Sequence, residues 1–331
     1  MLLRLFKGTG PVVIFLIIIT LFAVWLSAIL KPAVDSLSYL TAEPMPLYGL
    51  LRLITVKTQY LGVIVSFLMV SIMAFLLVNF NTRVLFINER TFLPALIYIL
   101  LGGLFPQYQS LNPVLPASIF LMVAFGRIMD SYRKQGIVYN YFDAGILISL
   151  GSLFYANLIW FGLLVFIGIA LLRSSNIVEI TTSVLGLITP YVITFGVYYV
   201  MGKDLRVLIS LIENNLIGKS AVYEFSRLSI VALITIGIIL IVSIGHLFRL
   251  LNTKKIRARQ TFFLLIWGFI ISIGVYIFVP SSSVEMIWIM IIPVSYVLTH
   301  YFVFVRRKLV PEIFFSVLFV LILLIQIWYL R

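Results

Sequence analysis

Residues 31–57 hold four charged side chains that could support group-transfer chemistry: Asp35, Glu43, Arg52 and Lys57. A carboxylate can take the proton from an attacking hydroxyl group. Arginine and lysine can neutralise a phosphate leaving group, where negative charge develops in the transition state. The candidate catalytic residues are therefore Asp35 and, as second choice, Glu43. The candidate substrate-binding residues are Arg52 and Lys57.

The same four residues also have a purely structural interpretation. Asp35 would cap a short helix in this connector, while Lys31, Arg52 and Lys57 extend their charged ends toward lipid headgroups. Charges at a membrane boundary are common, so residue types alone favour this interpretation over catalysis.

Composition excludes several other kinds of active site. The chain has no cysteine and only two histidines, which removes disulfides, thiolate nucleophiles, Cys-based zinc sites and His-rich metal sites. It has no phosphate-loop motif, and Gly8-Thr9-Gly10 is only a fragment of a dinucleotide-binding fingerprint. We therefore expect no cofactor and no required metal ion.

The elements that position these side chains are predicted to lie in a lipid bilayer. Hydrophobic residues make up 63% of the 331 positions and charged residues 11%, whereas soluble domains carry about a quarter charged residues. No connector is long enough to fold alone, so residues 1–331 are predicted to form a single all-α integral membrane domain. About eleven apolar segments are predicted to span the membrane: 11–30, 58–79, 92–105, 114–129, 143–155, 158–172, 181–201, 229–248, 261–279, 285–303 and 312–330.

The distribution of basic residues predicts the orientation of these spans. With a cytoplasmic N-terminus, sixteen of the 24 Lys and Arg residues fall in inner connectors and eight on the outer side. This bias favours an inside N-terminus and an extracytoplasmic C-terminus. Because the net charge of +13 comes from connectors beside spans, it indicates membrane orientation and headgroup contact, and we expect no nucleic-acid partner.

Three predicted spans and two connectors have distinctive patterns. Segments 92–105, 143–155 and 158–172 are short by the standard of about twenty residues, so we expect them to be surrounded by protein. The outer connectors 31–57 and 203–216 carry apolar residues at helical spacing opposite polar ones. Each is predicted to contain an amphipathic helix in the membrane interface.

Four sequence segments resemble a family of bacterial inner-membrane proteins of unknown function: YFDAGILI at 141–148, GSLFY at 151–155, GLITPY at 186–191 and RTFLPAL at 90–96. The resemblance implies an inner-membrane location and no particular activity. More distantly, the layout is similar to membrane glycosyltransferases of the GT-C class. Those enzymes carry a catalytic acidic residue on the first outer loop and use polyprenyl-phosphate sugar donors. By that resemblance Asp35 would be the carboxylate, and Arg52 or Lys57 would meet the donor phosphate.

Three functions remain open at this point. The leading hypothesis is transfer of a sugar or similar group from a polyprenyl-phosphate carrier at the outer face. The first alternative is a non-catalytic subunit that binds protein partners in an envelope complex. The second is a transporter of lipids or lipid-linked sugars, with the break around Asn157 forming one wall of its cavity. The resemblance to GT-C enzymes is one of layout, and layout alone does not establish a function.

Overall fold

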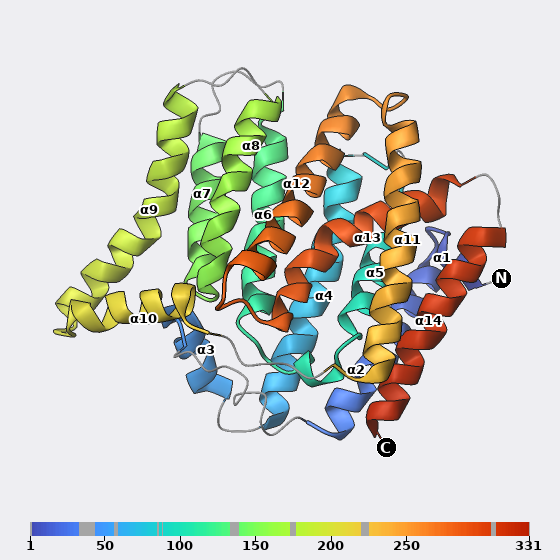
Figure 1. The fold of residues 1–331 in the computed structure, drawn as a ribbon, viewed down its shortest axis with the longest axis horizontal. Helices are drawn as coiled ribbons and strands as arrows, with labels where there is room; N and C mark the ends of the chain where they lie inside the picture. The colour runs from blue at the N-terminus through green and yellow to red at the C-terminus, as the bar shows by residue number, and fades with distance from the viewer. Residues whose placement is uncertain are drawn as a thin grey trace.

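The computed structural model describes residues 2–32, 44–55, 59–84, 86–87, 89–132, 139–172, 177–219, 225–305 and 309–330. All regular secondary structure within these ranges is helical. This confirms the all-α prediction for the described part of the chain. The helices form one bundle, and most of them run between its two ends (Figure 1).

The first half of the chain forms the following elements: α1 (Leu2–Phe6), α2 (Pro11–Leu30), α3 (Pro46–Thr55), α4 (Gln59–Val84), α5 (Leu93–Gly102), the 3-10 helix η1 (Pro106–Tyr108), α6 (Val114–Asp130) and α7 (Tyr139–Ser152). The second half forms η2 (Ala156–Phe161), α8 (Gly162–Leu172), α9 (Ile177–Val200), α10 (Leu205–Ile217), α11 (Arg227–Leu251), α12 (Ile256–Phe278), η3 (Val284–Met286), α13 (Ile287–Phe304) and α14 (Leu309–Leu330).

Seven segments within the described ranges are helical, long enough and apolar enough to cross a membrane. They contain α2, α4, α9, α11, α12, α13 with its preceding η3 turn, and α14. Each of the eleven predicted segments coincides with at least one helix, but α5, α6, α7 and α8 are shorter than these seven. An integral membrane protein is therefore supported. The count of eleven spans and the orientation stay predictions.

The centre of the bundle is built around a short helix, as the sequence predicts. All ten residues of α5 are buried. Lipid cannot satisfy the backbone groups at the ends of a short helix, so such a helix needs protein around it. Helix α13 also belongs to the core, because fourteen of its residues are buried. The predicted break after residue 155 is confirmed, because α7 ends at Ser152 and η2 begins at Ala156.

The two predicted amphipathic segments form α3 and α10, and both lie at the same end of the bundle (Figure 1). Helix α10 runs across the bundle end next to the lower end of α9, with α3 beside it (Figure 1). Their placement at one end agrees with the prediction that both connectors emerge on the same side of the membrane. Their location in a membrane interface remains a prediction.

Candidate functional site

A groove of about 880 Å³ opens at the α3–α10 end of the bundle. Its size is within the range of about 300–1,000 Å³ that is usual for ligand sites. Three elements provide most of its wall: most of α3, the C-terminal half of α7 and the C-terminal half of α9. The residues that line it are Pro44, Pro46, Leu47, Gly49, Leu50, Arg52, Leu53, Ile146, Leu150, Leu153, Thr189, Pro190, Ile193, Thr194, Val197, Tyr198, Met201 and Lys203.

Helix α3 forms the first wall. It begins at Pro46, where the missing backbone N–H of proline costs nothing and its fixed φ favours the first helical turn. Leu47, Leu50 and Leu53 follow at a spacing of three residues, and this face lines the groove. Two hydrogen bonds attach the helix to the bundle: Leu47 N donates to the Leu153 carbonyl at 3.1 Å, and Tyr48 Oη donates to the Leu111 carbonyl at 3.1 Å.

Helices α7 and α9 form the opposite wall, and glycines bring them together. A Cβ atom on Gly186 would lie 2.4 Å from the Phe142 carbonyl oxygen, and one on Gly145 would lie 2.7 Å from the Ser183 carbonyl oxygen. Only residues without a side chain permit such a close backbone approach. Farther along α9, the hydroxyl of Thr194 donates to the Pro190 carbonyl at 2.8 Å. This bond is internal to the helix, so the wall presents mostly carbon atoms.

The end of α9 places a lysine at the mouth of the groove. Gly202 has φ = 67°, a left-handed conformation that glycine adopts without strain. The Lys203 N–H then bonds to the Tyr198 carbonyl at 3.0 Å, which closes the helix in a Schellman-like turn. The Lys203 ammonium lies 5.2 Å from the centre of the Tyr198 ring. This contact holds the cation beside an aromatic side chain that also lines the groove.

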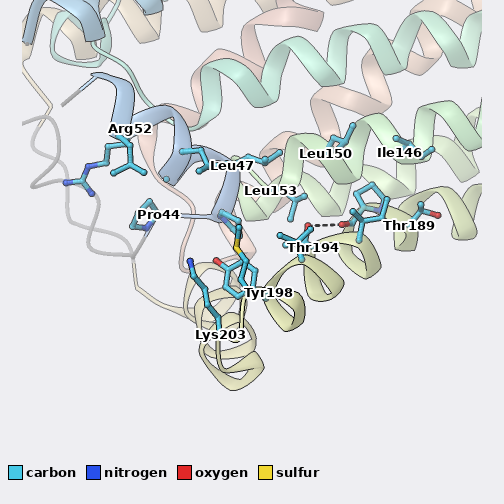
Figure 2. A pocket seen from close by; sticks show the side chains of 18 residues that line it. Pro44, Leu47, Arg52, Ile146, Leu150, Leu153, Thr189, Thr194, Tyr198 and Lys203 are labelled. Carbon is cyan, nitrogen blue, oxygen red and sulfur yellow. Dashed lines mark hydrogen bonds between the residues drawn. The ribbon is translucent and has the colours of Figure 1, made fainter. Parts of the chain in front are cut away.

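Two cations from separate connectors lie at the same end of the groove. Arg52 is a half-buried residue of α3, and Lys203 lies in the turn between α9 and α10. Figure 2 shows both at one end, with Ile146 and Thr189 toward the other. An apolar groove with cations at one end matches the chemistry of an amphipathic anion, whose chain prefers carbon surroundings and whose phosphate prefers arginine and lysine.

The structure brings one of the four predicted site residues to this groove, namely Arg52. Asp35, Glu43 and Lys57 lie outside the described residues. Their roles as catalytic carboxylates and phosphate-binding cation therefore stay predictions. Pro44, the first described residue after the segment bearing both carboxylates, lines the groove.

Sequence reasoning missed two residues at this end of the bundle. Lys203 appeared only as one charge on an amphipathic helix, although its position directly after Gly202 at a helix end was a usable signal. Glu285 appeared only as the first residue of a predicted span. Its side chain is 2% exposed, and its Oε2 atom has no hydrogen-bond partner among the described residues.

Glu285 lies close enough to α3 to influence it electrostatically. Burial raises the pKa of the Tyr48 phenol well above its usual range, and the Glu285 carboxyl group raises it further, whereas Arg52 acts in the opposite direction. Arg52, Tyr48 and Glu285 are therefore neighbours.

Within the described ranges, no group of three or more His, Asp or Glu side chains could hold a metal ion. The described polar groups in and near the groove are therefore two cations, tyrosine and threonine hydroxyl groups, and the buried carboxyl group of Glu285.

Comparison with known proteins identifies a family and no characterised relative. No curated protein matches the chain, and no solved structure matches it. A family model described as "Family of unknown function (DUF6427)" matches residues 45–331, which include all helices from α3 onward and every residue that lines the groove except Pro44. This confirms the resemblance to an uncharacterised family and leaves the resemblance to GT-C enzymes as a proposal. The chain belongs to this family of unknown function, DUF6427.

Proposed function

We propose that this protein transfers a sugar or similar group from a polyprenyl-phosphate carrier at the extracytoplasmic face of the bacterial inner membrane. The observation that carries the proposal is the groove, whose wall is apolar and whose one end holds Arg52 and Lys203. A polyprenyl chain would lie along the leucines of α3 and α7, and its phosphate would meet the two cations. Neither common nucleotide-binding motif is present, which favours a lipid carrier over a nucleotide sugar.

The proposed reaction is a displacement at the sugar carbon that bears the phosphate. Asp35, or Glu43 as second choice, takes the proton of the acceptor hydroxyl group. The acceptor oxygen forms a bond to that carbon while the bond from carbon to phosphate oxygen breaks. The electron pair stays on the lipid phosphate, where Arg52, Lys203 and Lys57 stabilise the added charge. The products are the glycosylated acceptor and the free polyprenyl phosphate.

A transfer assay with a radiolabelled polyprenyl-phosphate sugar tests this proposal on the full-length protein in lipid nanodiscs. Asp35→Asn is expected to lower the rate by at least about a hundredfold, which is the usual contribution of a general base. Glu43→Gln tests the second carboxylate. Glu213→Gln is the matched control, because Glu213 is an exposed carboxylate on α10 and does not line the groove. Transfer at the wild-type rate in both the Asp35 and Glu43 variants would exclude this mechanism.

A second candidate function, transport of a lipid-linked substrate, is favoured by one observation. The connection between α7 and α8 meets the connection between the separate spans α12 and α13, where Asn157 Nδ2 donates to Ser281 Oγ at 2.9 Å. Helices α7 and α8 are shorter than the seven membrane-spanning segments, and unusually short hydrophobic segments are common at the binding sites of transporters. A flipping assay in proteoliposomes separates the two functions, since a transporter moves the labelled lipid between leaflets without cleaving it.

A further inference from the structure

The buried carboxyl group of Glu285 lies beside the α3–α10 end of the bundle. Glu285 belongs to η3, directly after the turn of Ser281, Ser282 and Ser283. Its side chain is 2% exposed, and Oε2 has no hydrogen-bond partner in the described part of the chain. Ionisable groups buried in membrane proteins are costly and are commonly functional. A charged carboxylate in such a place needs a cation or several donors, and without them the neutral carboxyl group is favoured.

The phenols of two tyrosines from different elements lie within electrostatic range of this carboxyl group. Tyr48 comes from α3 and Tyr155 from the turn between α7 and η2, and both phenols interact electrostatically with Glu285. Tyr155 Oη accepts a hydrogen bond from Asn157 Nδ2 at 3.4 Å. Arg52, which acts on Tyr48, is the charged group that α3 places in this neighbourhood. Tyrosine side chains are ordinarily neutral below about pH 10, so neither phenol supplies a charge that would offset a Glu285 carboxylate near neutral pH.

Helix α3 is held against the α7–η2 turn, which carries Tyr155, and it also forms a wall of the groove. Just before the helix, Met45 is 1% exposed and packs with Leu153, Ala156 and Leu211. Tyr48 on the helix is 2% exposed. The leucine face of the same helix lines the groove. Any displacement of α3 that lets water reach Glu285 therefore also changes the groove.

We propose that Glu285 is a proton-binding site whose neutral carboxyl group keeps α3 docked, so that proton binding and lipid binding in the groove are coupled. Loss of the proton leaves a carboxylate that is stable only if water or a cation reaches it, and this favours conformations with α3 displaced. Docking of α3 is thus complete at low pH and weakens as pH rises. The lipid part of this inference rests on the proposed function, whereas the docking part does not.

Cysteine labelling measures α3 docking without any lipid ligand. Because the chain has no cysteine, a single introduced thiol is the only one that reacts. Met45→Cys places the thiol in the buried contact under α3, and Ser210→Cys places one at an exposed position of α10 as a reference for the intrinsic pH dependence of the thiol. Relative to this reference, the Met45→Cys labelling rate is expected to rise about tenfold between pH 5 and pH 9, because local opening exposes the site.

The variant Glu285→Gln tests whether this carboxyl group is responsible. Glutamine keeps the shape of the neutral acid and cannot lose a proton, so labelling at residue 45 should stay slow at every pH. Glu179→Gln is the matched control, since Glu179 on α9 is also 2% exposed, and it should keep the wild-type profile. The proposal is wrong if labelling at residue 45 is independent of pH in the wild-type background. It is equally wrong if Glu285→Gln retains the full pH dependence.

Binding of a fluorescent polyprenyl phosphate to the same proteins in nanodiscs tests the coupling. Affinity of the wild type relative to that of Glu285→Gln should fall as pH rises, because the variant reports the ionisation of the lipid phosphate alone. If labelling behaves as expected and the lipid does not bind at any pH, the proposed function fails while the proton site stands. If the lipid binds with an affinity that is unaffected by Glu285→Gln across the whole pH range, the coupling is refuted while the lipid site stands.

Discussion

Two regions of the bundle differ in whether their buried polar side chains have hydrogen-bond partners. On the side of α2, η1 and α14, the buried side chains of Ser27, Gln109 and Gln326 are joined in one network. Gln109 Nε2 donates to the Val24 carbonyl at 3.0 Å, and Gln326 Nε2 donates to the Gly103 carbonyl at 2.7 Å. Ser27 Oγ is within hydrogen-bond reach of both glutamine side chains. On the side of α3, α7 and η3, the equally buried Glu285 has an oxygen with no hydrogen-bond partner among the residues that the structure describes.

The contrast separates a polar network that stabilises the fold from a polar group that is available for function. Satisfied networks in an apolar interior fix the packing of the helices that share them. An unsatisfied buried acid destabilises the fold and persists where something else is gained from it. We therefore expect changes in the first region to alter stability alone, and changes in the second region to alter binding and its pH dependence.

The largest change in the free energy of unfolding is expected from a substitution that pushes α7 and α9 apart. Gly186→Val would place a side chain against the Phe142 carbonyl oxygen, which cannot move without shifting α7. The free energy of unfolding should fall by about 3 kcal/mol, at the upper end for overpacking. Denaturant-induced unfolding of the protein in mixed micelles measures this free energy. The matched control is Gly196→Val on the same helix, where an added Cβ meets nothing within 4 Å, and an equal loss there would contradict the packing role of Gly186.

A smaller effect is expected at the mouth of the groove. Arg52→Ala combined with Lys203→Ala removes the two cations that line it, each worth about 1 kcal/mol toward an anionic lipid headgroup. Affinity for a polyprenyl phosphate should therefore fall by about thirtyfold. Stability should change little. Arg206→Ala is the control, because Arg206 is an exposed cation on α10 that does not line the groove. The same loss of affinity in this control would show that general surface charge is responsible.

A substitution in the hydrogen-bonded network of Ser27, Gln109 and Gln326 tests whether the two regions are independent. Gln326→Leu keeps the volume of the side chain but leaves the Gly103 carbonyl and Ser27 hydroxyl groups without this partner. The free energy of unfolding should fall by about 1–2 kcal/mol. The pH profile of labelling at residue 45 should be unchanged. Leu324→Ala, at an exposed position of the same helix, serves as the control for a substitution in α14. A shifted labelling profile in Gln326→Leu would mean that the two regions are not independent.

The smallest effect is expected from the cap of α10. Asp204 accepts a hydrogen bond from the Arg206 N–H at 2.9 Å and begins the helix next to Lys203. Asp204→Ala should destabilise α10 locally by about 0.5–1 kcal/mol. Hydrogen–deuterium exchange of residues 205–217 detects this change as faster exchange at the helix start. Exchange in α13 should stay the same, and acceleration there would indicate a global effect instead.

One residue of the candidate site could be anticipated from local patterns. Arg52 was predicted as a substrate-binding residue because it follows an amphipathic stretch, and it does line the groove. Its partner Lys203 could not be paired with it, because 150 residues separate the two and no local pattern joins them. Glu285 looked like an ordinary charge at the start of a span. Its burial depends on tertiary packing, which no local pattern reveals.

Local sequence patterns establish that this chain is an apolar helical protein, that a helix ends near residue 155, and that α3 and α10 are amphipathic. Those properties depend on hydrophobic content and on spacings within one helix, which are local. The tertiary structure is needed to see that Arg52 and Lys203 line the same groove and that the Glu285 carboxyl group is buried. Such juxtapositions depend on which helix faces pack together, and in this bundle that is decided by contacts such as the one at Gly186, where two distant backbones meet.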